Sequence, residues 1–411
     1  MNIIKDVKSI LFEEIALLDI KQNKLAFIFG CLALSPLIGF LPSFTMLYRL
    51  LMIGICIWML THSKKFDNTC IFLLFAGAIS IILSSPDPMF KSWFRFGLFL
   101  ILFISISPLI KDNYVVIFKR NLLQFSLFVS IIVSVVSFAF YFLGINYMTN
   151  LDSNEYIGNA GSFGGLTSHS MLLGPVSAVS TIYCSYRALS TKNKLYWLLC
   201  IPSFACTLFS SSRSAFLCAV LGVITMLYIN AGNKRNFFKR IFLIGIICSI
   251  TFPLWSGALS GLEAKQQGNV DRGSTFSSRE SKWDNRLDEF SDSPIWGVGF
   301  CACDPKHVDD YMPSTGTIET GSSWLAVLSM TGILGFIPFG IIIYKSVKRV
   351  WSKRRTNIEA SLYLGLIVFL SIHMLVEGYI FAGGSVLCFF AWLIISCCYE
   401  IEVKNDINIL Q

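Results

Sequence analysis

The chain has 411 residues, of which 54% are hydrophobic and only 14% are charged, and its mean hydropathy is +0.65. Soluble domains carry about 25% charged residues, so this composition excludes an ordinary water-soluble domain. The net charge of +8 does not indicate nucleic-acid binding, because the basic residues fall on the connections between apolar runs.

These apolar runs are close to the roughly 20 residues that a helix needs to cross a bilayer. Helices satisfy their own backbone groups in lipid, which open strands cannot do. The sequence therefore predicts an all-α polytopic membrane protein, with residues 1–411 as a single membrane domain. About twelve spans are expected, at 25–42, 45–62, 69–85, 93–110, 122–143, 165–186, 195–211, 214–231, 241–257, 322–344, 359–380 and 384–400. One long polar loop, 258–321, separates the ninth span from the tenth.

The distribution of Lys and Arg predicts the orientation of these spans. If the N-terminus is cytoplasmic, every inner connection is basic, and 23 of the 33 Lys and Arg residues lie on the inner side. Such an excess on one side is the usual topology signal. We therefore expect both termini in the cytoplasm and the 258–321 loop outside.

Arg213 follows three serines and opens the eighth span at the outer surface. One interpretation is an arginine at a helix end that extends toward water, because a charge in hydrocarbon is expensive. The other is an anion site, since helix-start amides, serine hydroxyls and a guanidinium together bind phosphate. The sequence leaves both open.

Within the outer loop, Trp283, Leu287 and Phe290 recur at helical spacing and predict a short amphipathic helix whose apolar face lies on the membrane domain. Arg279 and Arg286 lie near one another on such a helix. Acidic residues are interleaved, so a solvated charged face is the alternative. Because the segment lies on the same membrane side as Arg213, we favour a site that binds a diphosphate. The loop also contains Cys301 and Cys303, whose short, strained ring disfavours a disulfide.

Other titratable residues flank the outer ends of spans. Glu319 precedes the tenth span, either as a general base for a sugar hydroxyl or as a helix N-terminal charge. His373 and Glu377 stand four residues apart on the eleventh span and share a face. We expect them to support an outer cavity as a polar patch, without a metal, because further ligands are lacking. His169 opens the sixth span after a tight turn.

Together these features resemble the O-antigen ligase and Wzy-type polymerase superfamily. The resemblance covers roughly residues 150–400, and the first five spans match only in hydropathy. The motifs that carry it are Phe163 to Gly174, Ser212-Arg213-Ser214, Arg279, Ser293-Pro294, Trp296-Gly297-Val298-Gly299, Thr331 to Gly335 and His373 to Gly384.

The resemblance implies a GT-C-like, metal-independent glycosyltransferase in the bacterial inner membrane, with no cofactor and with its long loop in the periplasm. Undecaprenyl-diphosphate-linked glycan would be the donor and a lipid-linked glycan the acceptor. A chain-length regulator and a flippase are partners of such an enzyme. By position, Arg213 and Arg279 resemble the arginines that hold the donor diphosphate, with Arg286 assisting and Glu319 activating the acceptor.

Ligases that attach O-antigen to lipid A-core resemble one another in a histidine-asparagine pair before the tenth span. Here that region reads Gly321-Ser322-Ser323, with Glu319 upstream and no histidine. This departure favours a polymerase of surface polysaccharide, with a ligase as the alternative. A twelve-span flippase is a third hypothesis, which the outer position of the arginines disfavours.

Overall fold

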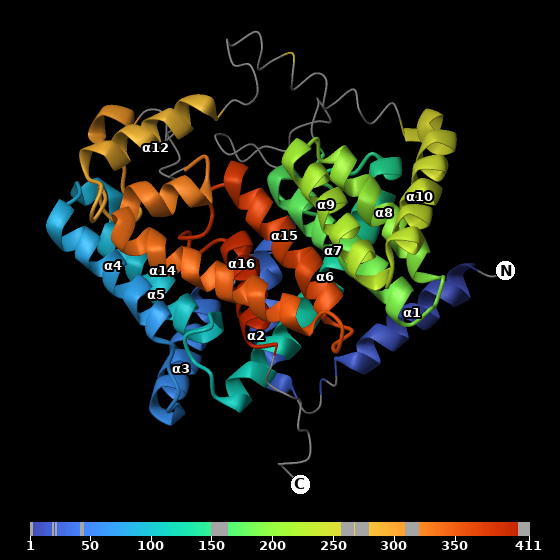
Figure 1. Ribbon diagram of the computed structural model, residues 1–411, viewed down its shortest axis with the longest axis horizontal. Helices are drawn as coiled ribbons and strands as arrows, with labels where there is room; N and C mark the ends of the chain where they lie inside the picture. The colour runs from blue at the N-terminus through green and yellow to red at the C-terminus, as the bar shows by residue number, and fades with distance from the viewer. Residues whose placement is uncertain are drawn as a thin grey trace. The chain divides into compact units, whose positions relative to one another are not determined.

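The structure is a computed structural model that describes residues 3–18, 20, 23–41, 45–148, 163–255, 267, 279–308 and 320–401. In these residues the secondary structure is helical, apart from one isolated antiparallel bridge between Phe66 and Ile110 (Figure 1). Glu319 and most of the predicted 258–321 loop lie outside the described residues.

The helices follow the apolar runs of the sequence. They are α1 (Ile3–Leu17), α2 (Lys24–Leu34), α3 (Thr45–His62), α4 (Asn68–Ser84), α5 (Ser92–Ile106), α6 (Asn113–Leu143), α7 (Ser170–Ser190), α8 (Tyr196–Phe209), α9 (Arg213–Asn230), α10 (Lys234–Trp255), α12 (Glu280–Asp292), α14 (Ser323–Lys353), α15 (Ala360–Val376) and α16 (Val386–Tyr399). Short 3-10 helices are η1 (Ser35–Leu37), η2 (Pro88–Phe90) and η4 (Pro305–His307).

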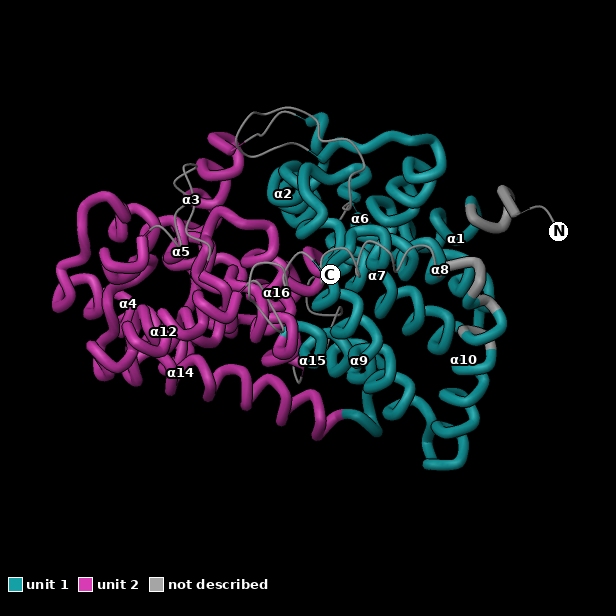
Figure 2. The backbone as a smooth tube through the Cα atoms, turned by 90° about the horizontal axis from the view of Figure 1, so that it is seen from above, with its two compact units in different colours: residues 1–44, 124–277, 354–370 teal, residues 45–123, 278–353, 371–411 magenta. Residues whose placement is uncertain are grey.

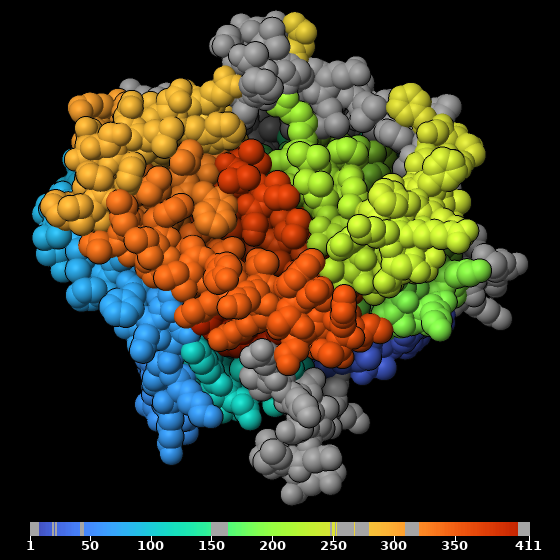
Figure 3. All heavy atoms as spheres, in the orientation of Figure 1, coloured from blue at the N-terminus to red at the C-terminus, as the bar shows by residue number. Residues whose placement is uncertain are grey.

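Each of the twelve predicted spans coincides with one of these helices, from α2 to α10 and from α14 to α16. In the described part of the chain, 5 helical segments are long and apolar enough to cross a membrane. Large apolar side chains such as Met46 and Leu50 on α3, and Phe72 on α4, are exposed. The segments that carry them form part of the surface in Figure 3, in blue. These findings fit a multi-pass membrane protein, and the number of twelve spans stays a prediction.

The chain forms two compact units, each assembled from three segments (Figure 2). Unit 1 comprises residues 1–44, 124–277 and 354–370, and unit 2 comprises residues 45–123, 278–353 and 371–411. Because each unit draws on the beginning, middle and end of the sequence, neither is a consecutive domain.

In unit 1, α7 packs closely against α8 and α9. Small and hydroxyl-bearing residues allow this approach: Ser180 bonds Ser203 at 2.8 Å, and Gly222 lies directly against Ile182. Helix α1 is fastened to the ends of α7 and α8, where the buried Glu14 carboxylate accepts hydrogen bonds from Tyr183 and Tyr196. Glu14 therefore fastens α1 to α7 and α8.

In unit 2, α14 is broken at Gly332, which has a φ of 60° and a ψ of −163°. The Ser293–Phe300 turn fits against this break: the Val298 amide donates to the Ser329 carbonyl at 2.9 Å, and the Ile333 amide donates to the Pro294 carbonyl at 2.9 Å. A Cβ on Gly332 would collide with the Ile295 carbonyl. The tryptophan–glycine motif and the glycine break of the tenth span are thus packed against each other and joined by backbone hydrogen bonds.

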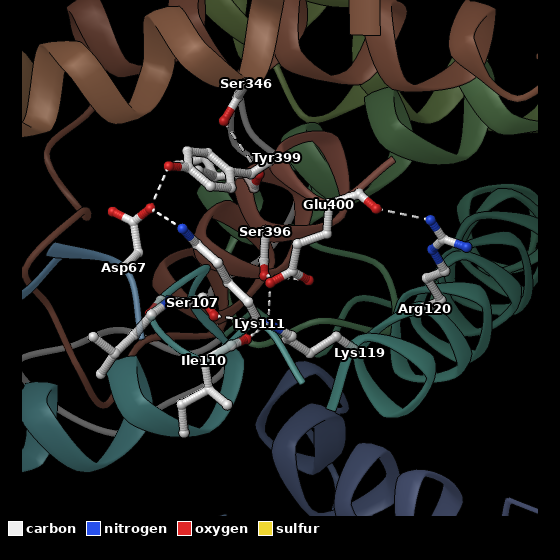
Figure 4. A network of polar contacts seen from close by, with 12 residues as sticks. Asp67, Ser107, Ile110, Lys111, Lys119, Arg120, Ser346, Ser396, Tyr399 and Glu400 are labelled. Carbon is white, nitrogen blue, oxygen red and sulfur yellow. Dashed lines mark hydrogen bonds and ion pairs between the residues drawn. The ribbon is translucent and has the colours of Figure 1, made fainter. Parts of the chain in front are cut away.

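A buried polar network lies at the C-terminal end of α16 in unit 2 (Figure 4). The Lys119 ammonium, which is fully buried, donates to Glu400 at 2.5 Å and to the carbonyls of Ser107 and Ile110 at 3.0 Å each. Lys119 belongs to the connection expected between the spans at 93–110 and 122–143, but α6 begins at Asn113 and carries it inside the helical core. Its buried partner, Glu400, makes this position possible.

Candidate functional site

The candidate site in unit 2 lies where α15 ends. The last carbonyls of a helix have no partner within the helix and need other donors. Side chains from the start of α14 supply several: Ser322 bonds the Met374 carbonyl at 3.2 Å, and the Trp324 indole donates to the Ser371 carbonyl at 3.0 Å. Ser323 bonds the Glu377 carbonyl at 2.7 Å. The Thr320–Trp324 run is therefore a cap for another helix as well as the start of α14.

Arg279 supplies a further cap to the same helix end. Its Nη1 donates to the Val376 carbonyl and lies 2.7 Å from the Glu377 carboxylate. The side chains of Arg279 and Glu377 are 12% and 16% exposed, so the ion pair is at the edge of the packed helices. A cation at a helix C-terminus is favoured by the helix dipole. Two of the residues singled out in the sequence are thereby brought into direct contact.

His373 and Glu377 take different roles, although they are only four residues apart. His373 lies in the last turn of α15, and Glu377 follows the end of this helix at Val376. His373 is buried, and its Nδ1 lies 3.1 Å from the Tyr379 hydroxyl. Tyr379 is fixed in turn because its amide donates to Ser323 at 3.0 Å. His373 therefore packs beneath the site, whereas Glu377 reaches the half-buried Arg279.

A closed series of contacts surrounds this spot. We call it the Arg279 ring and define it as Arg279, Glu377, Gly378, Thr320, Gly321 and Trp283. The Arg279–Glu377 ion pair is the first link, and Gly378 follows Glu377 and touches the Thr320 hydroxyl. Gly321, next to Thr320, accepts a 3.3 Å hydrogen bond from the Trp283 indole. The Trp283 amide donates to the Arg279 carbonyl at 3.0 Å, which closes the series.

Helix α12 confirms the amphipathic helix predicted from Trp283, Leu287 and Phe290, but the packed face is different. Leu287 is 45% exposed, and the buried residues of α12 are Arg286 and Glu289. The packed face is thus centred on Arg286 and Glu289, while Trp283 and Phe290 of the expected apolar face are half-buried. The reason is that Arg286 and Glu289, three residues apart, neutralise each other at 2.7 Å and can be buried together.

Arg286 is fully buried, and its Nη1 reaches three different groups. Besides the ion pair with Glu289, its Nη1 donates to the Ala302 carbonyl and to the Ser329 hydroxyl, each at 3.2 Å. These bonds join α12 to the 300–304 segment and to α14. The arrangement favours a structural role for Arg286 over the expected contact with a diphosphate.

The cysteines of the same segment are free and buried. Burial raises the pKa of the Cys301 and Cys303 thiols to about 12, with nearby Arg95 and Arg286 acting in the opposite direction. Both thiols therefore stay protonated at neutral pH, and the absence of a disulfide stays a prediction.

Arg213 lies in unit 1, where it is the first residue of α9. The Ser212 side chain caps the helix by accepting from the Ala215 amide. Gly174, in the first turns of α7, packs against Ser210 and Ser212. Helices α7 and α9 therefore begin side by side.

His169 is the N-cap of α7, and its Nδ1 accepts from the Met171 amide at 3.0 Å. The expected tight turn precedes it, at Gly165 with a φ of 55°. Glu319, the expected general base, lies outside the described residues, immediately before Thr320 of the Arg279 ring.

Sequence analysis did not single out Thr320, Tyr379 or the carbonyls at the end of α15. Their importance depends on contacts between segments about 50 to 100 residues apart. A signal was nevertheless present. The glycine-rich stretch after Glu377 cannot continue a helix easily, so it marks a helix end that needs partners.

The described fold and the Arg279 ring define a helical membrane protein with an arginine held at the edge of its bundle. Residues 198–340 match the family model of the O-antigen ligase. The match runs from α8 to α14 and contains both Arg213 and Arg279. It confirms the resemblance to the O-antigen ligase and Wzy-type polymerase superfamily. No curated protein matches the chain.

Proposed function

We propose that this protein polymerises undecaprenyl-diphosphate-linked oligosaccharide repeat units into O-antigen or a related surface polysaccharide on the periplasmic face of the bacterial inner membrane. The observation that carries the proposal is the position of Arg279. Its guanidinium is anchored by the Val376 carbonyl and Glu377, yet it remains partly exposed, in a segment that matches the O-antigen ligase model. N- and C-termini in the cytoplasm and the long loop in the periplasm are part of the proposal.

The reaction transfers a glycan between two lipid-linked substrates. The bond between the anomeric carbon and the donor diphosphate breaks, and a bond forms between that carbon and a hydroxyl oxygen of the acceptor. Undecaprenyl diphosphate leaves, and the hydroxyl proton passes to a base, for which we propose Glu319. Arg279 neutralises the charge that grows on the leaving diphosphate, which is commonly the largest single contribution to such catalysis.

Arginine suits this task better than lysine because its planar fork holds two phosphate oxygens at once. In the proposal Glu377 fixes the guanidinium so that the fork meets the diphosphate in a defined orientation. Arg213 binds diphosphate as well, a role that rests on the resemblance and on the serine-capped helix start that it occupies. His169, His373 and Glu377 support the site without reacting.

The experiment is a polymerisation assay in detergent with lipid-linked repeat units extracted from cells that lack the protein. Wild type is expected to produce a ladder of polymer. Arg279→Ala and Arg213→Ala are each expected to reduce chain extension by at least about a hundredfold, because each removes a charge that stabilises the transition state. Arg235→Ala on α10 is the matched control, since this arginine is exposed and belongs neither to the Arg279 ring nor to the start of α9 at Arg213. Normal polymer from either test variant would contradict the proposal, and absence of polymer from wild type would favour a transporter.

Ligation to lipid A-core is the second candidate, because the matching family model is that of the O-antigen ligase. The Gly321-Ser322-Ser323 sequence before α14, without a histidine, favours the polymerase. Deletion of the protein separates the two functions. Lipopolysaccharide with a single repeat indicates a polymerase, whereas bare core with polymer left on the lipid carrier indicates a ligase.

A further inference from the structure

The Arg279 ring contains two side chains that a diphosphate site does not require. Trp283 lies in the first turn of α12, and its amide donates to the carbonyl of Arg279, the N-cap of this helix, at 3.0 Å. The Trp283 indole is partly exposed, and its N–H is bound to the Gly321 carbonyl at 3.3 Å. This hydrogen bond fixes the orientation of a large flat ring beside the arginine.

Gly321 makes the close approach of Trp283 possible. Its φ is 71°, a conformation that other residues rarely adopt, and a Cβ at this position would lie 2.9 Å from Cβ of Lys282. The 320–322 turn can therefore lie directly against α12 only with glycine here. The turn also contains Thr320, the neighbouring member of the Arg279 ring.

Thr320 is only 9% exposed, and its hydroxyl has no hydrogen-bond partner among the residues that the structure describes. The hydroxyl touches Gly378, which follows the Glu377 that holds Arg279. Buried hydroxyls almost always have a partner, so one without a partner beside a binding residue indicates a group that arrives with a ligand. A hydroxyl can both donate to and accept from a sugar hydroxyl.

Given the proposed function, we propose that Trp283 and Thr320 form the subsite for the sugar ring that is joined to the diphosphate held by Arg279. The flat indole covers the apolar face of the sugar, and Thr320 bonds one of its hydroxyls. An aromatic surface with a few placed polar groups is the usual composition of a small-ligand site. The sugar follows the diphosphate directly in the donor, just as Trp283 follows Arg279 by one helical turn.

Two probes separate the sugar subsite from the diphosphate site. One is undecaprenyl diphosphate, and the other is the lipid-linked repeat unit extracted from cells that lack the protein. Trp283→Ala and Thr320→Val are each expected to weaken binding of the repeat unit by about tenfold, the usual loss when an anchoring contact is truncated. Both variants should bind undecaprenyl diphosphate as wild type does, whereas Arg279→Ala should lose both probes.

Two further variants control for structure. Trp283→Phe keeps a flat ring but removes the indole N–H, so it should retain more repeat-unit binding than Trp283→Ala. Trp93→Ala on α5 removes an exposed tryptophan outside the ring and should bind both probes normally. Equal loss of both probes in Trp283→Ala and Thr320→Val would indicate only a structural role and would overturn the subsite, as would unchanged binding of both. If wild type binds neither probe, the proposed function itself fails.

Discussion

Two of the ion pairs in the described part of unit 2 differ in what surrounds them. Lys119 and Glu400 have side-chain exposures of 0% and 3%, whereas Arg279 and Glu377 have exposures of 12% and 16%. The Lys119 ammonium has three hydrogen atoms and three acceptors, and Glu400 also accepts from Ser396 at 3.2 Å. Such a saturated ion pair has no capacity left for a ligand, and its role is to hold α6 to the end of α16.

The Arg279–Glu377 pair is arranged otherwise. It lies at a helix end, beside a buried hydroxyl without a hydrogen-bond partner in the described residues and beside a partly exposed indole. The comparison teaches that an arginine or lysine in a membrane protein is informative only together with its partners.

The largest effect is expected at the saturated pair. Lys119→Met should lower the free energy of unfolding by about 3–5 kcal/mol, because the Glu400 carboxylate would remain buried without its cation. Unfolding in mixed detergent micelles with increasing sodium dodecyl sulfate measures the change. Combining Lys119→Met with Glu400→Leu should recover much of the loss. A single variant as stable as wild type would mean that this pair is not a structural element.

The next effect concerns activity and not stability. Arg279→Lys keeps the charge but loses the planar fork, and chain extension should fall by about a factor of 10² while the unfolding curve stays close to that of wild type. Arg286→Lys is the matched comparison on the same helix, and it should instead lower stability, because its bonds to Glu289, Ala302 and Ser329 are buried. If Arg279→Lys lowered stability and Arg286→Lys lowered chain extension instead, the roles assigned to the two arginines would be reversed.

A smaller effect is expected at Asp67, in the same network as Lys111 and Tyr399. Burial raises the pKa of the Asp67 carboxyl, but hydrogen bonds from Lys111 and Tyr399 and the charge of Lys111 outweigh it and lower the pKa to about 2. Since the folded pKa is below the unfolded one, the stabilisation is present above about pH 4 and is lost as the pH falls toward 2. Asp67→Asn should therefore cost about 2 kcal/mol at pH 7 and progressively less below pH 4. Unfolding curves at pH 7, 4 and 3 test this, and a pH-independent difference would contradict it.

The smallest effect is expected at Glu377. Glu377→Gln keeps an acceptor for Arg279 and should reduce chain extension by only a fewfold, while Glu377→Ala should reduce it by about tenfold, as the loss of a charged hydrogen bond of about 1.5 kcal/mol implies. Rates at saturating and limiting donor separate orientation from binding. Equal activity of Glu377→Ala and wild type would show that Val376 alone is sufficient to hold Arg279.

Much of the fold could be predicted from local sequence. Apolar runs gave the positions of α2 to α10 and α14 to α16, and the spacing of Trp283, Leu287 and Phe290 gave α12. The predicted eighth span begins within one residue of α9, whose Ser212 cap depends only on neighbours in sequence. These features are determined within one or two helical turns, so a single sequence contains them.

Contacts between distant segments could not be predicted in the same way. Arg279 meets Glu377 across 98 residues, and Lys119 meets Glu400 across 281. Lys119 counted as a topology signal, because its sequence neighbours include Lys111 and Arg120 and nothing nearby suggests a buried carboxylate. The burial of Arg286 on α12 was missed for the same reason, since its partners Ala302 and Ser329 lie 16 and 43 residues away.

The break in α14 has a consequence for biogenesis. At Gly332 the amides of Ile333 and Leu334 find acceptors in Pro294 and Ile295, which belong to a stretch translated earlier. Exposed backbone amides are poorly tolerated in hydrocarbon. The acceptors therefore leave the ribosome before the amides that require them.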